Sequence, residues 1–493
     1  MNSQKEMEGS RACGHTSRIL ILGVDSADLS LIREFVGEGA LPNLAKLMRM
    51  GIVRTLRSTI PDMTAPSWTS IFTGADPSTH GVYGFSQPSG HKIVRTGTSC
   101  KAIPVWDAIS SLCQKVIVDV PNMHVAKPLN GCMISWIHVG SDWVFPRDLL
   151  GDLHRFGYDR YQEPKRNVHW LCESIGTKSK VATYLLKKYN WCLSAIVFSE
   201  IDMAQHFFHY SRQKLLAVYS AMDVALGHIV STLESRSPVM IISDHGYVES
   251  KKIFYINHWL INAGLLIHRV PSGYKASIQD RVIRTLMKIS ERSANFVNQY
   301  FSWMLMNSEI RDILGPMWRL VESHSQQQER NDSIPGAYGP SSDLDCLEGL
   351  YCYGEDMGRY YRLYLTENSK MNYDSISQRL EEEISKVRDV QENKNPIVNL
   401  FKKRDIYSGV HSLDAPDYVL ELDPTYHGSG LIFDRSRIFA SISAGTHRPE
   451  GVFIGYNLDS CGVVPSGDLS TTDIVSIVMN ILDSRSLRKT DRK

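Results

Sequence analysis

Two ionisable side chains follow a short apolar segment near the middle of the chain. Val239–Ile242 is uniformly apolar, and Ser243, Asp244, His245 and Gly246 come directly after it. A short, fully apolar run predicts a buried strand of a parallel sheet, and such sheets place their ligands at the carboxyl ends of their strands. Asp and His are metal ligands by type. The pair indicates a metal site, with an ordinary turn after a strand as the alternative.

Further carboxylates and an imidazole follow two other predicted strands. Asp25 ends the strand predicted over 18–24, and a cap on the helix that follows is its alternative role. Asp202 and His206 follow the strand predicted over 194–199. If this segment is helical, a spacing of four places both side chains on one face, which suits a shared metal ion.

Two more histidines are candidates for the same site. His447 lies within Gly445–Gly451, which we predict to be a loop leading into a strand over 452–456. Loop histidines flanked by glycines seldom serve packing, so His447 is a candidate ligand. His209 lies three residues after His206, where neighbouring phenylalanines fit core packing equally well. We therefore leave His209 open.

A hydroxyl group completes the set of candidates. Pro66 is typical of the first turn of a helix, which places the start of that helix beside Thr64. The free backbone N–H groups at such a start favour an anion. The alternative role for Thr64 is that of a simple N-cap.

Alternating strands and helices must position these residues. The alternation is typical of one sheet with covering helices, and therefore of the α/β class. Strands are predicted over 18–24, 115–120, 133–137, 194–199, 239–242, 360–365, 418–422 and 452–456, and helices over 29–36, 42–50, 105–113, 178–189, 215–233 and 471–482.

The pattern changes to long amphipathic helix from about residue 271, and we interpret that part as an insertion that could cover a cleft. The second part of the core would complete the metal site because it carries His447. The predicted organisation is a polar N-terminal tail (1–17), a catalytic core in two parts (18–270 and 341–484), a mainly helical insertion (271–340) and a basic tail (485–493).

Composition limits the possible partners and location. Of 493 residues, 43% are hydrophobic and 22% are charged, and the formal net charge of +1 gives no electrostatic case for nucleic acid. The first seventeen residues lack the apolar core of a signal peptide, and we find no run of transmembrane length. Nine cysteines without C-x-x-C spacing predict reduced thiols and a cytoplasmic protein, so any metal needs oxygen and nitrogen ligands.

The order of these segments resembles the alkaline phosphatase superfamily, in its type I phosphodiesterase/nucleotide pyrophosphatase branch. The motifs are G-V-D, then M-T-x-P-x-W-T-S with T-G and H-G after it, then D-x-x-x-H, S-D-H-G and G-T-H-R-P-E-G. The resemblance implies an α/β three-layer sandwich with a central, mostly parallel sheet and helices on both faces. It also implies two divalent ions, usually zinc, one held by Asp25, Thr64, Asp244 and His245 and the other by Asp202, His206 and His447.

The activity that the resemblance implies is the hydrolysis of a phosphodiester or pyrophosphate bond. Three Asp side chains leave a positive charge on two divalent ions, which attracts phosphate. Thr64 would be the nucleophile, through a phosphothreonine intermediate. A phosphomonoesterase or phosphotransferase on the same site is the alternative, and a non-catalytic metal-binding protein is another.

Departures from the family patterns bear on the substrate. Phe85 stands where nucleotide pyrophosphatases carry an Asn that holds the phosphate, so nucleotide specificity is not implied. A sulfatase is not implied either, because Trp68 stands where sulfatases need an Arg. A monoester usually needs a further cation near Thr64, for which Arg95 and Lys101 are the candidates. We expect a small phosphate-ester substrate, with no nucleic-acid or membrane partner.

Overall fold

The computed structural model covers the predicted core and leaves out the predicted tail over 1–17, the predicted insertion over 271–340 and residues 488–493. Every structural statement below concerns the described part of the chain. The described residues are 18–89, 92–96, 100–109, 113–122, 126–136, 143–158, 165–268, 347–353, 358–430, 438–458 and 463–487.

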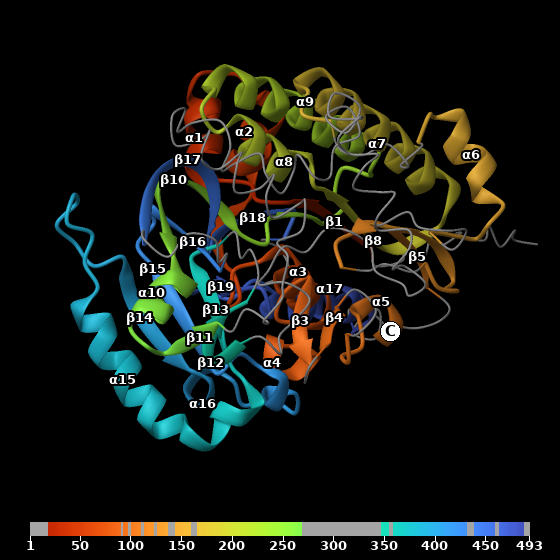
Figure 1. Cartoon of the computed structure of the whole chain (residues 1–493). Helices are drawn as coiled ribbons and strands as arrows, with labels where there is room; N and C mark the ends of the chain where they lie inside the picture. The colour runs from red at the N-terminus through yellow and green to blue at the C-terminus, as the bar shows by residue number, and fades with distance from the viewer. Residues whose placement is uncertain are drawn as a thin grey trace, which may run out of the picture.

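A nine-stranded sheet in the order β19-β2-β18-β9-β1-β8-β5-β6-β7 forms the centre of the described fold (Figure 1). Its middle strands, from β9 to β6, run parallel, and β18 and β7 are antiparallel to their neighbours. The strands are β1 (Ile19–Val24), β2 (Ile52–Arg57), β5 (Gln114–Val120), β6 (Gly131–Ser135), β7 (Val144–Phe145), β8 (Trp191–Phe198), β9 (Val239–Ile242), β18 (Glu450–Tyr456) and β19 (Leu469–Ser470).

Helices cover both faces of this sheet. Side chains alternate along each strand, so the buried strands present apolar residues on both faces. Leu20 and Leu22 of β1 face one apolar core, while Ile19 and Ile21 face the other. The first core is covered by α1 (Leu29–Gly37), α2 (Pro42–Met50), α6 (Leu149–Arg155), α7 (Val168–Lys188), α8 (Glu200–Phe208) and α9 (Arg212–Ser231), and the second by α3 (Thr64–Thr73), α5 (Val105–Ala108) and α17 (Asp473–Leu487). The predicted three-layer α/β sandwich is therefore confirmed (Figure 1).

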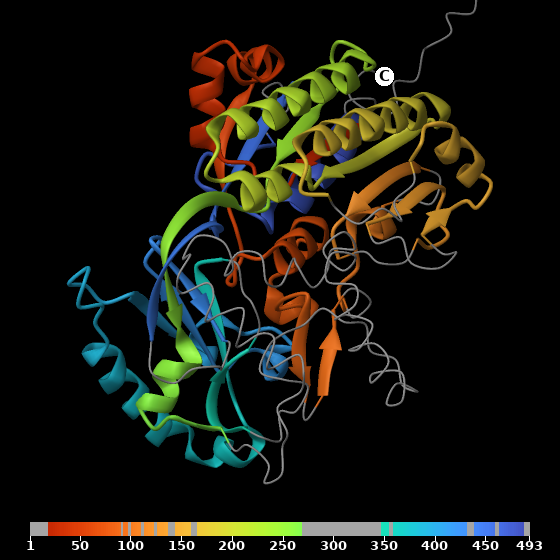
Figure 2. The same ribbon diagram turned by 45° about the horizontal axis from the view of Figure 1, so that its top comes forward.

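A second group of strands lies beside the large sheet (Figure 2). A three-stranded sheet has the order β16-β10-β17, and a five-stranded sheet has the order β11-β12-β13-β15-β14. The strands are β10 (Gly246–Tyr255), β11 (Leu266–His268), β12 (Leu347–Cys352), β13 (Tyr360–Leu365), β14 (Ile397–Lys402), β15 (Tyr418–Leu422), β16 (Tyr426–Ser429) and β17 (Phe439–Arg448). Short elements complete the fold: β3 (Ser86–Ser89), β4 (Lys92–Arg95), α4 (Pro77–His80), α10 (Ile256–Asn262), α15 (Tyr373–Lys386) and α16 (Lys403–Ile406).

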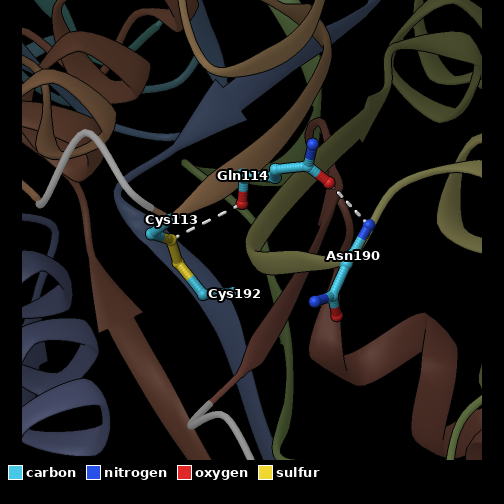
Figure 3. The surroundings of a disulfide bond; sticks show 4 residues. All are labelled: Cys113, Gln114, Asn190 and Cys192. Carbon is cyan, nitrogen blue, oxygen red and sulfur yellow. Dashed lines mark hydrogen bonds between the residues drawn. A yellow bond between two sulfur atoms is a disulfide. The ribbon is translucent and has the colours of Figure 1, made fainter.

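A disulfide joins Cys113 to Cys192 (Figure 3). Cys113 directly precedes β5 and Cys192 lies in β8, and the pairing of Gln114 with Trp191 brings these strand ends together. The expectation that all cysteines are reduced is therefore wrong for this pair. Cys100, Cys132, Cys172 and Cys352 are free thiols. The cytoplasmic location that rested on reduced cysteines stays a prediction.

From the sequence we expect no run of transmembrane length, but helix α9 is long and apolar enough to be one. By length and composition alone, Arg212–Ser231 could cross a membrane. A core helix passes the same test, and α9 packs against α7 and buries Val218, Met222 and Leu226 in the core. Packing within the fold accounts for its apolar face.

Candidate metal centre

Three neighbouring parallel strands deliver polar side chains to one edge of the large sheet. Asp25 directly follows β1, Asp244 follows β9, and Asp202 lies in the first turn of α8, after β8. In the sheet, β1 lies between β9 and β8. The carboxyl ends of these strands therefore bring the three carboxylates together, as expected for an α/β sheet.

The first cluster surrounds the imidazole of His245. Its Nε2 atom lies 3.2 Å from Asp244 Oδ2 and 3.6 Å from Asp25 Oδ1. The Thr64 Oγ1 atom lies 3.3 Å from the same nitrogen. All four residues are buried, with Thr64 the most exposed at 6%. The residues predicted to hold one ion thus lie together in the structure.

The second cluster surrounds one oxygen of Asp202. Asp202 Oδ1 lies 3.2 Å from His206 Nε2 and 3.5 Å from His447 Nε2. The two imidazole Nε2 atoms are 3.1 Å apart. Asp202 and His206 lie on one face of α8, where the spacing of four predicts them.

The two clusters are contiguous. The rings of His245 and His447 stack with their centroids 3.7 Å apart. Ligand atoms of Asp25, Asp202 and His245 also lie within 4.8 Å of one another. Asp202 is therefore within reach of both clusters, whereas the sequence interpretation assigned it to one ion only.

Each histidine of the site directs Nε2 toward the other ligands. The Nδ1 atoms of His206, His245 and His447 lie 3.0, 3.2 and 3.2 Å from the main-chain oxygens of Gly445, Gly246 and Asp62. A carbonyl oxygen only accepts, so Nδ1 carries the proton and Nε2 keeps its lone pair. Metal-binding histidines are oriented in this way.

Three buried carboxylate oxygens support the same interpretation. Asp25 Oδ1, Asp202 Oδ1 and Asp244 Oδ2 have no hydrogen-bond donor among the described residues. A buried oxygen left without a partner costs about 1–3 kcal/mol. Three such oxygens facing three imidazole lone pairs form a donor set that fits divalent cations with nitrogen and oxygen ligands, zinc among them.

Electrostatics differ between the clusters. Burial raises the pKa of Asp25 and Asp244 well above the usual range, and the Asp244 charge raises that of Asp25 further. Burial also holds the pKa of His245 well below its usual value. Burial would raise the pKa of Asp202 too, but His206 and His447 outweigh it and hold that pKa well below its usual value. The first cluster has no cationic side chain of its own, so a divalent ion would offset its charge.

Thr64 is the first residue of α3, and Met63 occupies the N-cap position without a side-chain cap hydrogen bond. The alternative role of Thr64 as the N-cap is therefore wrong. The N–H of Ser67 already donates to the Met63 carbonyl at 3.0 Å, and Pro66 has no N–H. The N–H groups of Thr64 and Ala65 remain at the helix start, beside the hydroxyl.

The alternative role of Asp25 as a helix cap is also wrong. Asp28 caps α1 and accepts from the N–H groups of Ser30 and Leu31. His209, left open above, lies 2.9 Å through Nε2 from Ser443 Oγ and does not belong to a candidate ligand group among the described residues. Asp25 is thus free to serve as a ligand, while His209 has a different contact.

His447 lies in β17, not in a loop as expected from the glycines around it. It pairs across the sheet with Tyr247 of β10. A side chain at Gly445 would stand 2.5 Å from the Gln205 carbonyl oxygen, and one at Gly451 would stand 2.3 Å from that of Ser243. These glycines permit close approach of β17 to α8 and of β18 to the segment after β9, and the pairing of β17 with β10 positions His447 at the site.

Sequence reasoning assigned no role to Asp62. Its main-chain oxygen contacts His447, and its carboxylate accepts from the N–H of Arg359. Burial raises the pKa of this carboxyl to about 8. No local signal could reveal the role, because Asp62 and its partners lie about three hundred or more positions apart in the sequence.

Phe85 stacks on Trp136, with ring centroids 5.7 Å apart, and is 38% exposed. The indole N–H of Trp136 donates to Ser199 Oγ at 3.2 Å, directly before α8. An aromatic surface therefore stands where the resemblance places an Asn. Lys101, a candidate cation, is exposed, and the side chain of Arg95 lies outside the description.

This three-layer fold, with Asp and His clusters at the strand ends, agrees with the resemblance to the alkaline phosphatase superfamily that the motifs indicated. Phosphonoacetate hydrolase from Sinorhizobium meliloti 1021, solved with phosphonoformate and with phosphonoacetate, shares the fold with a TM-score of 0.56. The alignments have 12% identity and cover 94% of this chain and 96% of that protein. No curated protein sequence matches the chain at a significant level.

The sequence profile of the type I phosphodiesterase/nucleotide pyrophosphatase family matches residues 19–312, more than half of the chain. The chain belongs to this family. It is a metal-dependent phosphoric ester hydrolase, and the match confirms the resemblance identified from the motifs.

Proposed function

We propose that this enzyme uses two zinc ions and Thr64 to hydrolyse a phosphodiester or pyrophosphate bond. The observation that carries the proposal is the position of the Thr64 hydroxyl, 3.3 Å from His245 Nε2 and at the start of α3. A nucleophile, a set of buried metal ligands and free helix N–H groups thus meet at one point. The family match supports the reaction class.

The donor set divides between two ions. When bound, two divalent cations would lower the pKa of a hydroxyl group and offset charge on the phosphoryl oxygens. In the proposed assignment Asp25, Thr64, Asp244 and His245 hold one ion, and Asp202, His206 and His447 hold the other, with Asp202 within reach of both.

The chain's own groups then perform the transfer. Thr64 Oγ1 bonds to phosphorus as the bond from phosphorus to the leaving oxygen breaks; the hydroxyl proton goes to solvent, and the leaving oxygen takes one up. The N–H groups of Thr64 and Ala65 donate to the phosphoryl oxygens. Water then displaces Oγ1 from the phosphothreonine and restores the hydroxyl.

A substrate comparison on the zinc-loaded protein tests the bond class. The panel is bis-p-nitrophenyl phosphate, p-nitrophenyl phosphate and a nucleotide pyrophosphate. We expect kcat/KM for the diester or the pyrophosphate to exceed that for the monoester at least about tenfold, or about 1.4 kcal/mol in activation free energy. A preference for the monoester would show that the enzyme is a phosphomonoesterase.

A further inference from the structure

We propose that Asp62 is a positioning residue, which fixes His447 and the start of α3 by tying both to the five-stranded sheet. The inference rests on the proposed role of His447 as a metal ligand. Asp62 contacts Arg359 and His447, so it would act through His447 and through Thr64, two residues further along the chain.

Asp62 makes contacts in two directions. Its main-chain oxygen lies 3.2 Å from His447 Nδ1, which fixes the tautomer and the ring orientation. Its side-chain oxygens Oδ1 and Oδ2 lie 3.0 and 3.3 Å from the main-chain nitrogen of Arg359. The residue is fully buried, so both sets of contacts are shielded from water.

Arg359, the partner of the Asp62 carboxylate, is itself fixed to the five-stranded sheet. Arg359 directly precedes β13, and its guanidinium lies 2.7 Å from Glu421 Oε1 and donates to the Leu422 carbonyl at 3.2 Å. Both partners belong to β15, the neighbour of β13 in the sheet. Nearer to the site, the Tyr407 hydroxyl donates to the Ile60 carbonyl at 2.9 Å. The chain between Ile60 and Asp62 is therefore anchored at two points, by Arg359 before β13 and by Tyr407 after α16.

The Asp62 carboxylate packs directly against Gly358. A Cβ atom at Gly358 would stand 1.9 Å from Asp62 Oδ1 and 3.2 Å from its main-chain oxygen. Any side chain at residue 358 would therefore push on the carboxylate and on the oxygen that orients His447. Gly358→Ala would therefore disturb the contact of Asp62 with the Arg359 N–H without removing the carboxylate.

The expected consequence is a weaker metal site. Without the carboxylate, the Arg359 N–H loses its buried acceptor and the loop loses its anchor, so the partner of His447 shifts. Loss of such an outer partner typically costs about 10–100-fold in metal affinity or activity. Asn keeps an acceptor oxygen for the Arg359 N–H, so Asp62→Asn should retain most of the zinc affinity that Asp62→Ala loses.

The test uses the zinc-loaded protein and measures the zinc dissociation constant by competition with a chromogenic chelator, beside kcat and thermal unfolding. Asp417→Ala is the matched control. Asp417 is also buried, directly precedes β15 of the same sheet, and its Oδ2 accepts from the N–H of Leu365 at 2.8 Å. We expect Asp62→Ala to raise the dissociation constant of the zinc held by His447 about 10–100-fold and to lower kcat, with rescue by Asp62→Asn. Asp417→Ala should lower the unfolding temperature and leave zinc binding unchanged.

Two results would overturn the inference: wild-type zinc affinity in Asp62→Ala, or an equal loss in Asp417→Ala. If Asp62→Ala does not fold, Gly358→Ala replaces it, with the same expected direction and the same contradicting result. His447→Ala separates the two proposals. If His447→Ala leaves zinc binding unchanged, the proposed ligand set fails; if it weakens binding and Asp62→Ala does not, only the role of Asp62 fails.

Discussion

The two ligand clusters are built differently. The deep cluster of Asp25, Asp244 and His245 follows strands of the parallel sheet, and its side chains are at most 2% exposed. In the open cluster of Asp202, His206 and His447, the side chains are 21%, 15% and 6% exposed. Helix α8 and strand β17 supply the open cluster, and β17 lies outside the large sheet.

This difference separates two tasks. Thr64 adjoins the deep cluster, where burial shields the hydroxyl that would attack phosphorus. The open cluster is the more exposed of the two, so we expect water and a leaving group to approach from its side. The deep cluster depends on one sheet, whereas the open cluster depends on contacts between separate elements, such as that of Asp62, before α3, with His447 of β17. The following predictions test this contrast, starting with the largest expected effect.

Loss of the Thr64 hydroxyl should remove turnover and spare the metal. Thr64→Ala should lower kcat by about 10³-fold or more, because no other described hydroxyl is seen to contact His245 Nε2. Hydrolysis of bis-p-nitrophenyl phosphate and zinc content by elemental analysis are the measurements. Thr73→Ala, at the other end of α3, is the control and should behave as wild type. Turnover retained in Thr64→Ala would show that the deep cluster does not hold the nucleophile.

Asp202 distinguishes connected clusters from independent ones. Because it is within reach of both, Asp202→Asn should weaken binding of both zinc ions, whereas His447→Ala should weaken binding of one. We expect each affected site to lose at least about tenfold in affinity, or 1.4 kcal/mol. Chelator competition gives both constants. If Asp202→Asn and His447→Ala weaken the same single site, the clusters are independent and the original assignment of Asp202 to one ion is correct.

A buried histidine beside helix α3, His80, should contribute to the acid sensitivity of the zinc-free protein. Burial lowers the pKa of His80 to about 3, and its Nε2 lies 2.9 Å from Ser70 Oγ in α3. An unfolded histidine titrates near 6.5, so the unfolded state binds more protons below that pH. Stability is therefore lost as pH falls, by about 2 kcal/mol at pH 5 for His80 alone.

Urea unfolding of wild type and His80→Gln between pH 7 and 5 measures this contribution, and the variant should show the flatter dependence. His206, in the open cluster, has the opposite sign. Burial lowers its pKa, but the charge and hydrogen bond of Asp202 outweigh burial and raise it overall. The stability that His206 contributes is present below its pKa in the unfolded state and is lost as pH rises through its pKa in the folded state. Equal slopes for His80→Gln and wild type would place the acid sensitivity elsewhere.

The smallest effect concerns an ion pair that joins the two clusters. Arg448, next to His447, lies 2.7 Å from Asp28 Oδ2, three residues after Asp25. The Arg448 side chain is 29% exposed, so we expect Arg448→Met to cost about 1 kcal/mol of unfolding free energy. Zinc affinity should stay unchanged. A lower zinc affinity in Arg448→Met would show that this pair also aligns the ligands.

Much of the fold could be predicted, because its signals are local. Helix α2 has the predicted bounds Pro42–Met50, and β9 matches the apolar run Val239–Ile242. Helix α5 ends at Ala108, well short of the predicted residue 113, because Ile109 is already extended. The ligands after parallel strands could be predicted for the same reason, since a strand end fixes where its next residue lies.

The remaining features depend on contacts that are distant in sequence. The glycines around His447 look like loop residues, yet they accommodate the carbonyls of Gln205 and Ser243. The Cys113–Cys192 disulfide requires knowledge that β5 and β8 are neighbours. The contact of Asp62 with Arg359 spans 297 positions. None of these relations leaves a local pattern in the chain.

The central claim is that Thr64 forms a covalent ester with the substrate phosphorus. Rapid acid quenching of the zinc-loaded enzyme during turnover of bis-p-nitrophenyl phosphate, followed by proteolysis and mass spectrometry, tests it most directly. We expect a phosphoryl adduct on Thr64 that forms in the first turnover, decays when substrate is exhausted and is absent from Thr64→Ala. An adduct on another residue, or steady turnover with an unmodified Thr64 at every quench time, would contradict the account.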